Sequence, residues 1–91
     1  MSAFADVCFE IAHDVVLRDE DRLCFKRSSG AVFYLNDIGY ASLLSFGSQC
    51  DMRTVAATIG QLWKAHPDRV EADLEPLALE LLSHGIIRRL E

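Results

Sequence analysis

Cysteine and histidine are the residues of this sequence best suited to nucleophilic, redox or metal chemistry. No Cys-x-x-Cys pair occurs, and no histidine stands at a zinc-ligand spacing from a cysteine. We therefore expect reduced cysteines that act as small core hydrophobes, with no catalytic residue, no metal and no cofactor. A Cys–His pair can form in space without any sequence signal, so a small thiol enzyme stays open as an alternative. The residues concerned are Cys8, Cys24, Cys50, His13, His66 and His84.

The charge balance is acidic along the whole chain. Fourteen acidic against nine basic residues give a net charge of −5, and neither residues 1–46 nor residues 47–91 are basic. Binding to a phosphate backbone needs clustered Lys and Arg, which neither half supplies. No apolar run approaches the ~20 residues that span a bilayer, and Asp6 and Glu10 stand where a secretory signal would be basic. We expect a cytoplasmic protein that binds neither nucleic acid nor membrane.

The stretch Ala31–Gly39 joins a strand to a helix and organises the elements around it. Small and apolar residues alternate up to Leu35, and Asn36 or Asp37 can then cap the first free amides of a helix. Within the strand, Phe33 and Leu35 are expected to face the core. Val32 and Tyr34, which alternate with these two residues, would face outward or line a groove.

The rest of the chain predicts an α+β fold, winged-helix-like, with a three-stranded antiparallel N-terminal β-meander followed by three α-helices. Short polar turns separate the three strands, and the third is an outer member of the sheet. We expect one domain over residues 1–91, with residues 1–8 frayed and residues 86–90 a short extended tail. The expected strands are 13–18, 22–27 and 31–35, and the expected helices are 37–46, 54–65 and 68–84.

Helical periodicity predicts which side chains of the three helices face the core. Pro76 interrupts the third helix, since proline removes one backbone hydrogen bond and clashes with the preceding turn. Either this helix kinks near Ala72 or its regular part begins later than Asp68. The expected inward residues are Ile38, Ala41, Leu43 and Leu44; Val55, Ile59, Leu62 and Trp63; and Val70, Leu74, Leu77, Ala78 and Leu81.

Several short motifs occur in a telling order: Phe33-Tyr34-Leu35-Asn36, a Gly39 helix with Leu43-Leu44, and a Thr54-Val55 helix start. The spaced pattern Asp73-Leu74-x-x-Leu77-Ala78-x-x-Leu81-x-x-x-Gly85-Ile86-Ile87 follows. In this order and spacing the chain resembles the PqqD-like peptide chaperones, also called RiPP recognition elements, over residues 13–87. The Pro-Glu pair expected before the third strand in the pyrroloquinoline quinone (PQQ) members is absent. A role in another pathway, such as lasso-peptide maturation, is therefore supported at least as well as a role in PQQ biosynthesis.

The resemblance implies a non-catalytic domain that binds the leader of a ribosomally made precursor peptide. The leader would add as a strand to the third strand, beside the third helix. The domain would then present it to a modifying enzyme such as a radical-SAM enzyme or a cyclase, or to a leader protease. The implied peptide-binding residues are Ala31, Val32, Phe33, Tyr34 and Leu35 on the strand, and Arg69, Asp73, Leu74 and Leu77 on the helix.

Two further readings compete with this one. A winged-helix DNA-binding regulator would need a basic recognition helix, yet residues 68–84 carry five acidic residues and only Arg69 as a base. Edge strands also pair with copies of themselves, so a homodimer through these edges is the other alternative.

Overall fold

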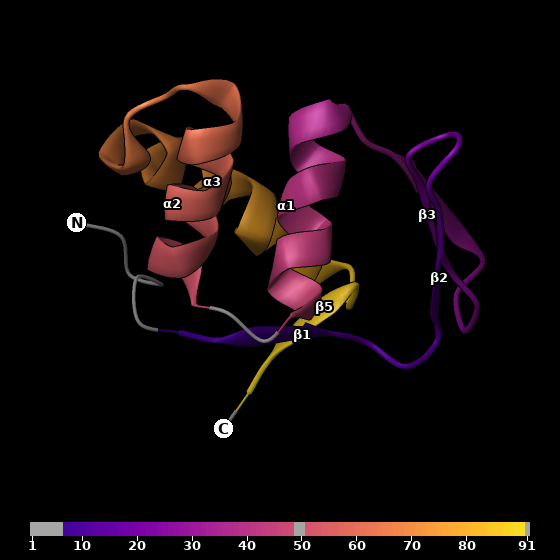
Figure 1. Ribbon diagram of the computed structural model, residues 1–91. Helices are drawn as coiled ribbons and strands as arrows, with labels where there is room; N and C mark the ends of the chain where they lie inside the picture. The colour runs from indigo at the N-terminus through magenta and orange to yellow at the C-terminus, as the bar shows by residue number, and fades with distance from the viewer. Residues whose placement is uncertain (1–6, 49–50, 91) are drawn as a thin grey trace.

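Eight short elements make up the part of the chain that the computed structural model describes, residues 7–48 and 51–90. Four strands precede three helices, and a fifth strand follows them (Figure 1). In chain order these are β1 (Phe9–Ile11), β2 (Val15–Arg18), β3 (Leu23–Lys26), β4 (Ala31–Tyr34), α1 (Asp37–Gly47), α2 (Met52–Trp63), α3 (Pro67–Ser83) and β5 (Ile87–Arg89).

The predicted meander is confirmed as the antiparallel sheet β2-β3-β4, and the α+β order with it. Leu17, Cys24 and Phe33 lie opposite one another across the three strands and face the helices. Gly30 closes the β3–β4 turn with a φ of +75°, a conformation that glycine adopts without steric cost.

A second sheet, β1-β5, is absent from the sequence prediction. The segment 86–90 is not a free tail, because Ile87 pairs with Ile11 and Arg89 with Phe9. Phe9 is fully buried and meets the ring of Phe46 edge-on, with centroids 5.3 Å apart. Cys8, expected in the frayed segment, accepts a hydrogen bond from the Leu90 amide. Residues 1–6 of that segment lie outside the described part.

Helix α1 buries a different face from the one expected. Leu43 is buried as expected, but Ile38 and Leu44, also predicted to point inward, are 40% and 43% exposed. Tyr40 and Phe46 are buried in their place. The helix carries apolar residues on more than one face, so its own periodicity does not select one. The position of Phe9 against Phe46 makes that selection. The expected N-cap is confirmed: Asn36 Oδ1 accepts the Gly39 amide at 2.7 Å.

Helices α2 and α3 pack against each other. Val55 and Ile59 are buried as expected, whereas Leu62 and Trp63 at the end of α2 are exposed, contrary to expectation. Helix α3 continues unbroken through Pro76, so the alternative of a later start is wrong. Pro76 and Ala72 are both exposed, which leaves the carbonyl that loses its helical partner open to water.

Candidate functional site

The free edge of β4 is the first feature of the candidate site. The Leu35 amide donates to the Arg22 carbonyl at 3.0 Å, which places residue 35 in a hydrogen-bonded pair with β3. Because such pairs alternate along an antiparallel ladder, the N–H and C=O groups of Val32 and Tyr34 point away from β3. No described residue pairs with them on that side, since β4 is an outer strand of its sheet. The edge thus offers two donors and two acceptors to another chain.

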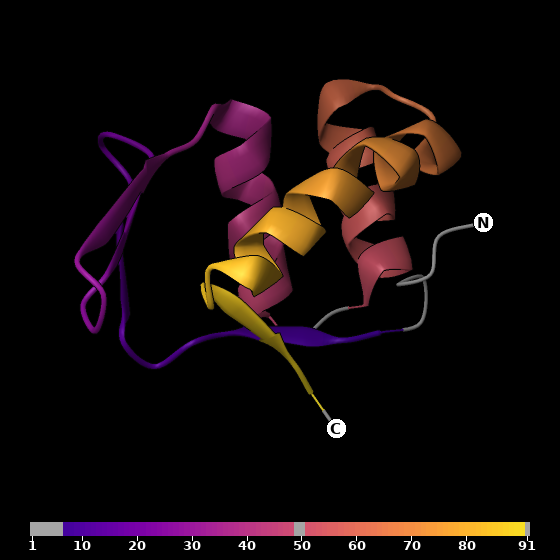
Figure 2. The same cartoon turned by 180° about the vertical axis from the view of Figure 1, so that it is seen from behind.

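Helix α3 runs beside this edge and diverges from it. In Figure 2 the C-terminal end of α3 approaches the sheet, the N-terminal half moves away, and α1 lies behind the interval between β4 and α3. The near end is fixed by contacts: the rings of Phe33 and His84 lie 4.7 Å apart, and Lys26 Nζ donates to the Gly85 carbonyl at 3.1 Å. We call the edge of β4, the exposed start of α1 and the facing flank of α3 the recognition face.

Lys26 is itself held by a carboxylate at the start of β2. Its ammonium group lies 3.0 Å from Asp14 Oδ1, and the amide of Ser28 donates to the other oxygen of Asp14. Hydrogen bonds from Ser28 and then Lys26 hold the pKa of Asp14 well below its ordinary value. The carboxylate therefore stays ionised and keeps the lysine directed at the end of α3.

The opposite end of the sheet is tied to the start of α1. The Tyr40 hydroxyl donates to Asp19 Oδ1 at 2.6 Å, and Arg22 pairs with Asp37 at 3.0 Å. Burial raises the pKa of Tyr40 to about 12, and the hydrogen bond to Asp19 adds to the effect. The sheet is thus held at both ends, which sets where the β4 edge lies relative to the helices.

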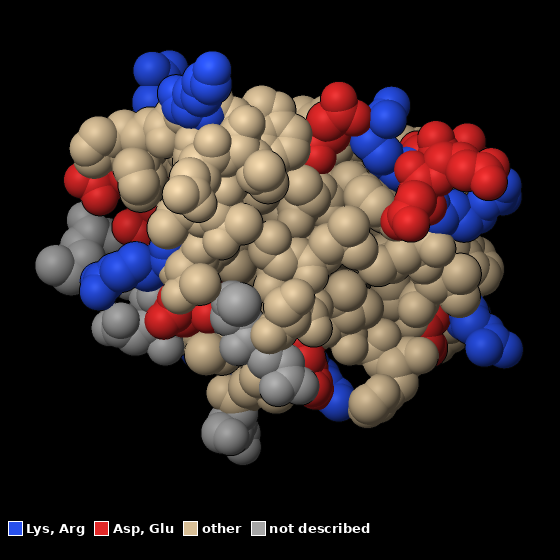
Figure 3. Space-filling view, in the orientation of Figure 1, with Lys and Arg blue, Asp and Glu red and all other residues tan. Residues whose placement is uncertain are grey.

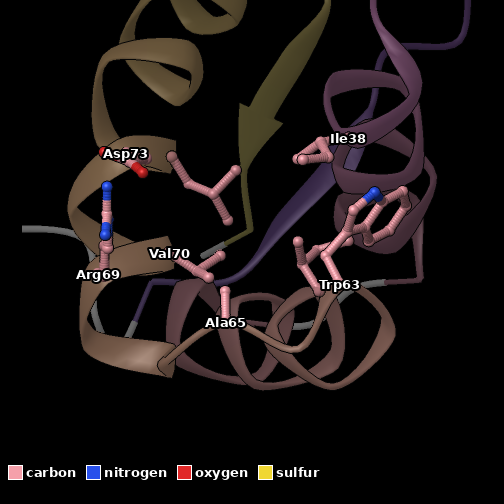
Figure 4. A pocket seen from close by; sticks show the side chains of 8 residues that line it. Ile38, Trp63, Ala65, Arg69, Val70 and Asp73 are labelled. Carbon is pink, nitrogen blue, oxygen red and sulfur yellow. The ribbon is translucent and has the colours of Figure 1, made fainter.

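An apolar pocket opens at the wide end of the recognition face, where α1 begins, α2 ends and α3 begins. Its cavity measures about 120 Å³. Ile38 and Trp63 line one side, Val70 faces them from α3, and Ala65 lies in the connection between α2 and α3 (Figure 4). Ile38 follows the last residue of β4 by four positions, so the pocket begins a short distance along the chain from the end of the free edge. The complete lining is Ile38, Ile59, Trp63, Ala65, Arg69, Val70, Asp73 and Leu74.

Two charged side chains of α3 stand at this pocket. Arg69 and Asp73 lie one helical turn apart on the same flank (Figure 4). Both are exposed, and neither forms an ion pair with a described residue. Each charge is therefore free to interact with a bound molecule.

The structure distributes the sequence-predicted residues over three places. Arg69, Asp73 and Leu74 line the pocket, and Leu77 is half-buried against the core. On β4, Phe33 faces the helices, but Val32 and Tyr34 are 45% and 74% exposed on the opposite face. The alternative that these two side chains face outward is therefore confirmed, and the alternative that they line a groove toward α3 is wrong. Only their backbone groups belong to the recognition face.

The sequence reasoning missed Ile38 and Trp63 as site residues, since it placed both in the core. An apolar residue at a helix end gives the same signal whether it packs inside or lines a pocket. For Trp63, its place at the last position of α2, just before the break at Lys64 and Ala65, is the one local feature that could have suggested exposure.

The thiols do not converge on the recognition face. Cys24 is fully buried in the core, and burial raises the pKa of its thiol, which disfavours the nucleophilic thiolate. Cys8 is half-buried beside β5, and Cys50 lies outside the described residues. Within residues 7–48 and 51–90, no group of three or more His, Cys, Asp or Glu side chains could hold a metal ion. Nor is any helix in these segments long and apolar enough to cross a bilayer.

No protein-family model matches the sequence, and no curated protein matches it significantly. Solved structures do match: the fold is that of the PqqD-like RiPP recognition elements, as the sequence motifs suggested. One is described as lasso peptide synthetase B1 complexed with the leader peptide. It is 18% identical, with a TM-score of 0.73 over 88% of this chain and 96% of that chain.

The second is the PqqD truncation of Methylobacterium extorquens PqqCD, described as a functional, stand-alone RiPP recognition element. It is 20% identical, with a TM-score of 0.74 over 98% of this chain and 96% of that chain. At these identities the similarity is one of fold.

Proposed function

We propose that this chain binds the leader segment of a ribosomally synthesised precursor peptide, without catalysing a reaction itself. The leader pairs with the β4 edge, beside α3, and is presented to a modifying enzyme or a leader protease. The observation that carries the proposal is the unpaired edge at Val32 and Tyr34, which ends four residues before Ile38 of the apolar pocket. Two structures that share the fold are described as a leader-peptide complex and a recognition element, which supports the same function.

The energetics require more than backbone pairing. Up to four hydrogen bonds at ~0.5–1.5 kcal/mol each give roughly 2–6 kcal/mol. Ordering about five peptide residues costs roughly 1–2 kcal/mol each, which offsets that gain. Affinity must therefore come from apolar side chains, each worth about 1.5–3 kcal/mol when buried. The pocket at Ile38 and Trp63 supplies a place for one of them.

The direction of the added strand decides which part of the leader reaches the pocket. An antiparallel strand places its N-terminal end opposite the C-terminal end of β4, which leads into α1 and the pocket. The leader residue in the pocket then precedes the paired segment. We infer a leader with a bulky apolar residue, such as Leu, Ile, Phe or Tyr, just N-terminal to an extended stretch, in a lasso-peptide, PQQ or other RiPP pathway.

The winged-helix DNA-binding alternative lacks support from the geometry. The α3 flank that would enter a groove carries Asp73 and Glu80 beside Arg69, and the helix as a whole is acidic. Such a surface repels a phosphate backbone.

The test is a titration of the chain with the synthetic leader of the precursor encoded beside its gene. We expect micromolar or tighter binding, a change in Trp63 fluorescence, and slowed amide hydrogen exchange at Val32 and Tyr34. The matched control is the Leu17 amide, which faces the other free edge of the same sheet and should exchange at an unchanged rate. Binding that leaves both β4 amides exchanging as in the free chain would refute strand addition. Salt-sensitive binding to duplex DNA instead of the leader would restore the alternative.

A further inference from the structure

The β2-β3-β4 sheet has a second free edge, that of β2, and its surroundings differ from those of the β4 edge. Neither view of the fold shows a helix next to β2, whereas α3 runs beside β4 (Figures 1 and 2). A peptide fits between β4 and α3, but a second folded domain brought against β4 would meet α3. At β2 a folded domain can approach the edge in the plane of the sheet.

The outward backbone groups of this edge belong to Val15 and Leu17. The Arg27 amide donates to the Asp14 carbonyl, which places residue 14 in a hydrogen-bonded pair with the strand beside it. By alternation, Val15 and Leu17 then point away from β3. The Val15 amide is already engaged, because it donates to the Ala12 carbonyl at 3.2 Å. A strand that pairs with β2 therefore finds the Leu17 amide as donor and the carbonyls of Val15 and Leu17 as acceptors.

The side chains along this edge complement those of a second copy of the chain. Antiparallel pairing centred on Val16 sets this residue against Val16 of the copy, and it sets Val15 against Leu17. Asp14 then lies opposite Arg18, and the two-fold symmetry repeats this pair of opposite charges on the other side of the centre. The same register suits the backbone, since the Leu17 amide of each copy meets the Val15 carbonyl of the other.

Both charged side chains are accessible for this contact. The side chain of Asp14 is 32% exposed while it holds Lys26, and the side chain of Arg18 is 59% exposed. Arg18 lies 3.4 Å from Asp21, its neighbour along the chain, in an exposed pair of the kind that contributes little. Arg18 can therefore exchange this neighbour for Asp14 of the copy at small cost.

The neighbouring registers fit less well. Pairing centred on Leu17 sets Asp14 against Glu20, which belongs to the turn after β2, the red and blue cluster at the upper right of Figure 3. Like charges directly opposite each other are destabilising. Pairing centred on Val15 needs the Val15 amide, which is already engaged. Charge and backbone together select the register centred on Val16.

We propose that the β2 edge is an interface between two copies of this chain, paired antiparallel about Val16. The joint sheet has six strands, and the two β4 edges lie at its outer ends, where they stay open. The pairing gives a role to Val16, which is 42% exposed on the sheet. At the centre of the interface the two Val16 side chains form a pair without backbone hydrogen bonds, the kind in which side chains come closest.

The dimer is weak and depends on concentration. Both strands are ordered before they meet, so the cost of ordering a free peptide does not arise. The paired edges are five residues long, about 17 Å, and bury less than the roughly 1,200 Å² at which standard interfaces begin. The dimer therefore forms as the chain concentration is raised.

The first test is amide hydrogen exchange and sedimentation equilibrium of the wild-type chain without any leader. We expect a monomer at about 0.01 mM and a substantial share of dimer at about 1 mM, with the Leu17 amide exchanging more slowly at the higher concentration. The amides of Val32 and Tyr34 should exchange at the same rate at both. A chain that stays monomeric at about 1 mM overturns the proposal, and so does protection at Val32 and Tyr34 in place of Leu17.

The second test reverses one charge of the interface. Arg18→Glu sets a carboxylate against Asp14 in both symmetric pairs, so we expect the dimer Kd to rise about tenfold or more. Arg27→Glu is the matched control, since it makes the same change in net charge at an exposed position of the β3–β4 turn. Its Kd should stay within about twofold of wild type. Equal weakening by the two variants would trace the effect to net charge and overturn the proposed register.

The third test separates pairing of edges from stacking of faces. Val16→Lys brings two ammonium groups together at the centre of the interface and should abolish the dimer. Val32→Lys adds the same charge to the same face of the sheet, at nearly equal exposure, but lies on β4 and should leave the dimer intact. Circular dichroism verifies that both variants fold. Equal loss of the dimer would show that the two faces stack, which overturns pairing at β2. None of these measurements uses a leader, so they are independent of the proposed function.

Discussion

The two edges of the β2-β3-β4 sheet are chemically alike and differ in what lies beside them. The Arg27 amide donates to the Asp14 carbonyl at 2.8 Å, so by alternation the backbone groups of Leu17 point out from β2. The edge of β4 presents those of Val32 and Tyr34 in the same way. Helix α3 lies on the β4 side, with Arg69 and Asp73 at a pocket (Figures 2 and 4). Neither view shows a helix beside the β2 edge (Figures 1 and 2).

This difference teaches that an open edge is necessary for strand addition but does not select a guest. Backbone pairing alone roughly cancels the cost of ordering a peptide. Side-chain contacts with a neighbouring helix must then supply the net affinity and the specificity. The substitutions that test leader binding alter these contributions at or beside the β4 edge and leave the β2 edge unchanged as a reference.

The largest expected effect comes from Val32→Pro. Proline removes the outward amide of Val32 and places its ring where the guest strand must approach, while the bonds from β4 to β3 stay intact. We expect the leader Kd to rise about hundredfold or more, equivalent to roughly 2.7 kcal/mol, measured by isothermal titration calorimetry.

The matched control is Val32→Ala, which shortens the same side chain but keeps the amide. Because the Val32 side chain lies on the outer face, this variant should bind the leader nearly as well as wild type. Full binding by a folded Val32→Pro variant would show that the guest does not pair with β4.

A roughly tenfold weakening is expected from Ile38→Ala, because the variant removes apolar contact area at the pocket. Leu44→Ala is the matched control, since both residues lie on α1 with nearly equal exposure and only Ile38 lines the pocket. Tenfold corresponds to about 1.4 kcal/mol, within the value of partly burying one isoleucine. If Ile38→Ala and Leu44→Ala change the leader Kd equally, the pocket does not contribute to peptide binding.

Smaller, opposed effects are expected at the two charges of the pocket. A leader with Glu beside its anchor residue should bind Arg69→Gln more weakly and Asp73→Asn more tightly than wild type. A leader with Lys at the same position should reverse both changes. Exposed pairs contribute about 0.2–1 kcal/mol, so we expect two- to fivefold changes that shrink as salt is raised. Fluorescence anisotropy at two salt concentrations measures them.

The smallest effect concerns acid stability. Asp14 has a pKa lowered from 3.8, so its contribution to stability is present above that value and is lost as the pH falls toward the lowered folded value. Wild type should therefore lose more stability than Asp14→Asn between about pH 4 and pH 2, as measured by urea unfolding. Equal losses would show that the contact between Lys26 and Asp14 does not hold the sheet against α3.

Local rules were sufficient for a large part of the fold, including the strand whose edge is the first feature of the candidate site. The Asn36 cap, the Gly30 turn and the alternation through Phe33 each depend on residues a few positions apart, so the β4–α1 junction could be read from the sequence. The exposed apolar ends of α1 and α2 could not. Ile38 and Trp63 were assigned to the core because periodicity ranks faces of one helix and does not show which face a neighbouring element covers.

By itself the sequence determined the meander, the bounds of α1 and α3 to within one residue, and the acidic face of α3, since capping, turn chemistry and strand alternation act over a few residues. Helix α2 begins and ends two residues earlier than predicted, at Met52 and Trp63. Only the tertiary structure decided that Phe9–Ile11 pairs with Ile87–Arg89, and thereby which face of α1 is buried. That pairing joins segments more than seventy residues apart, and its stability comes from burying Phe9 against Phe46. Burial between distant segments leaves no local pattern in the sequence.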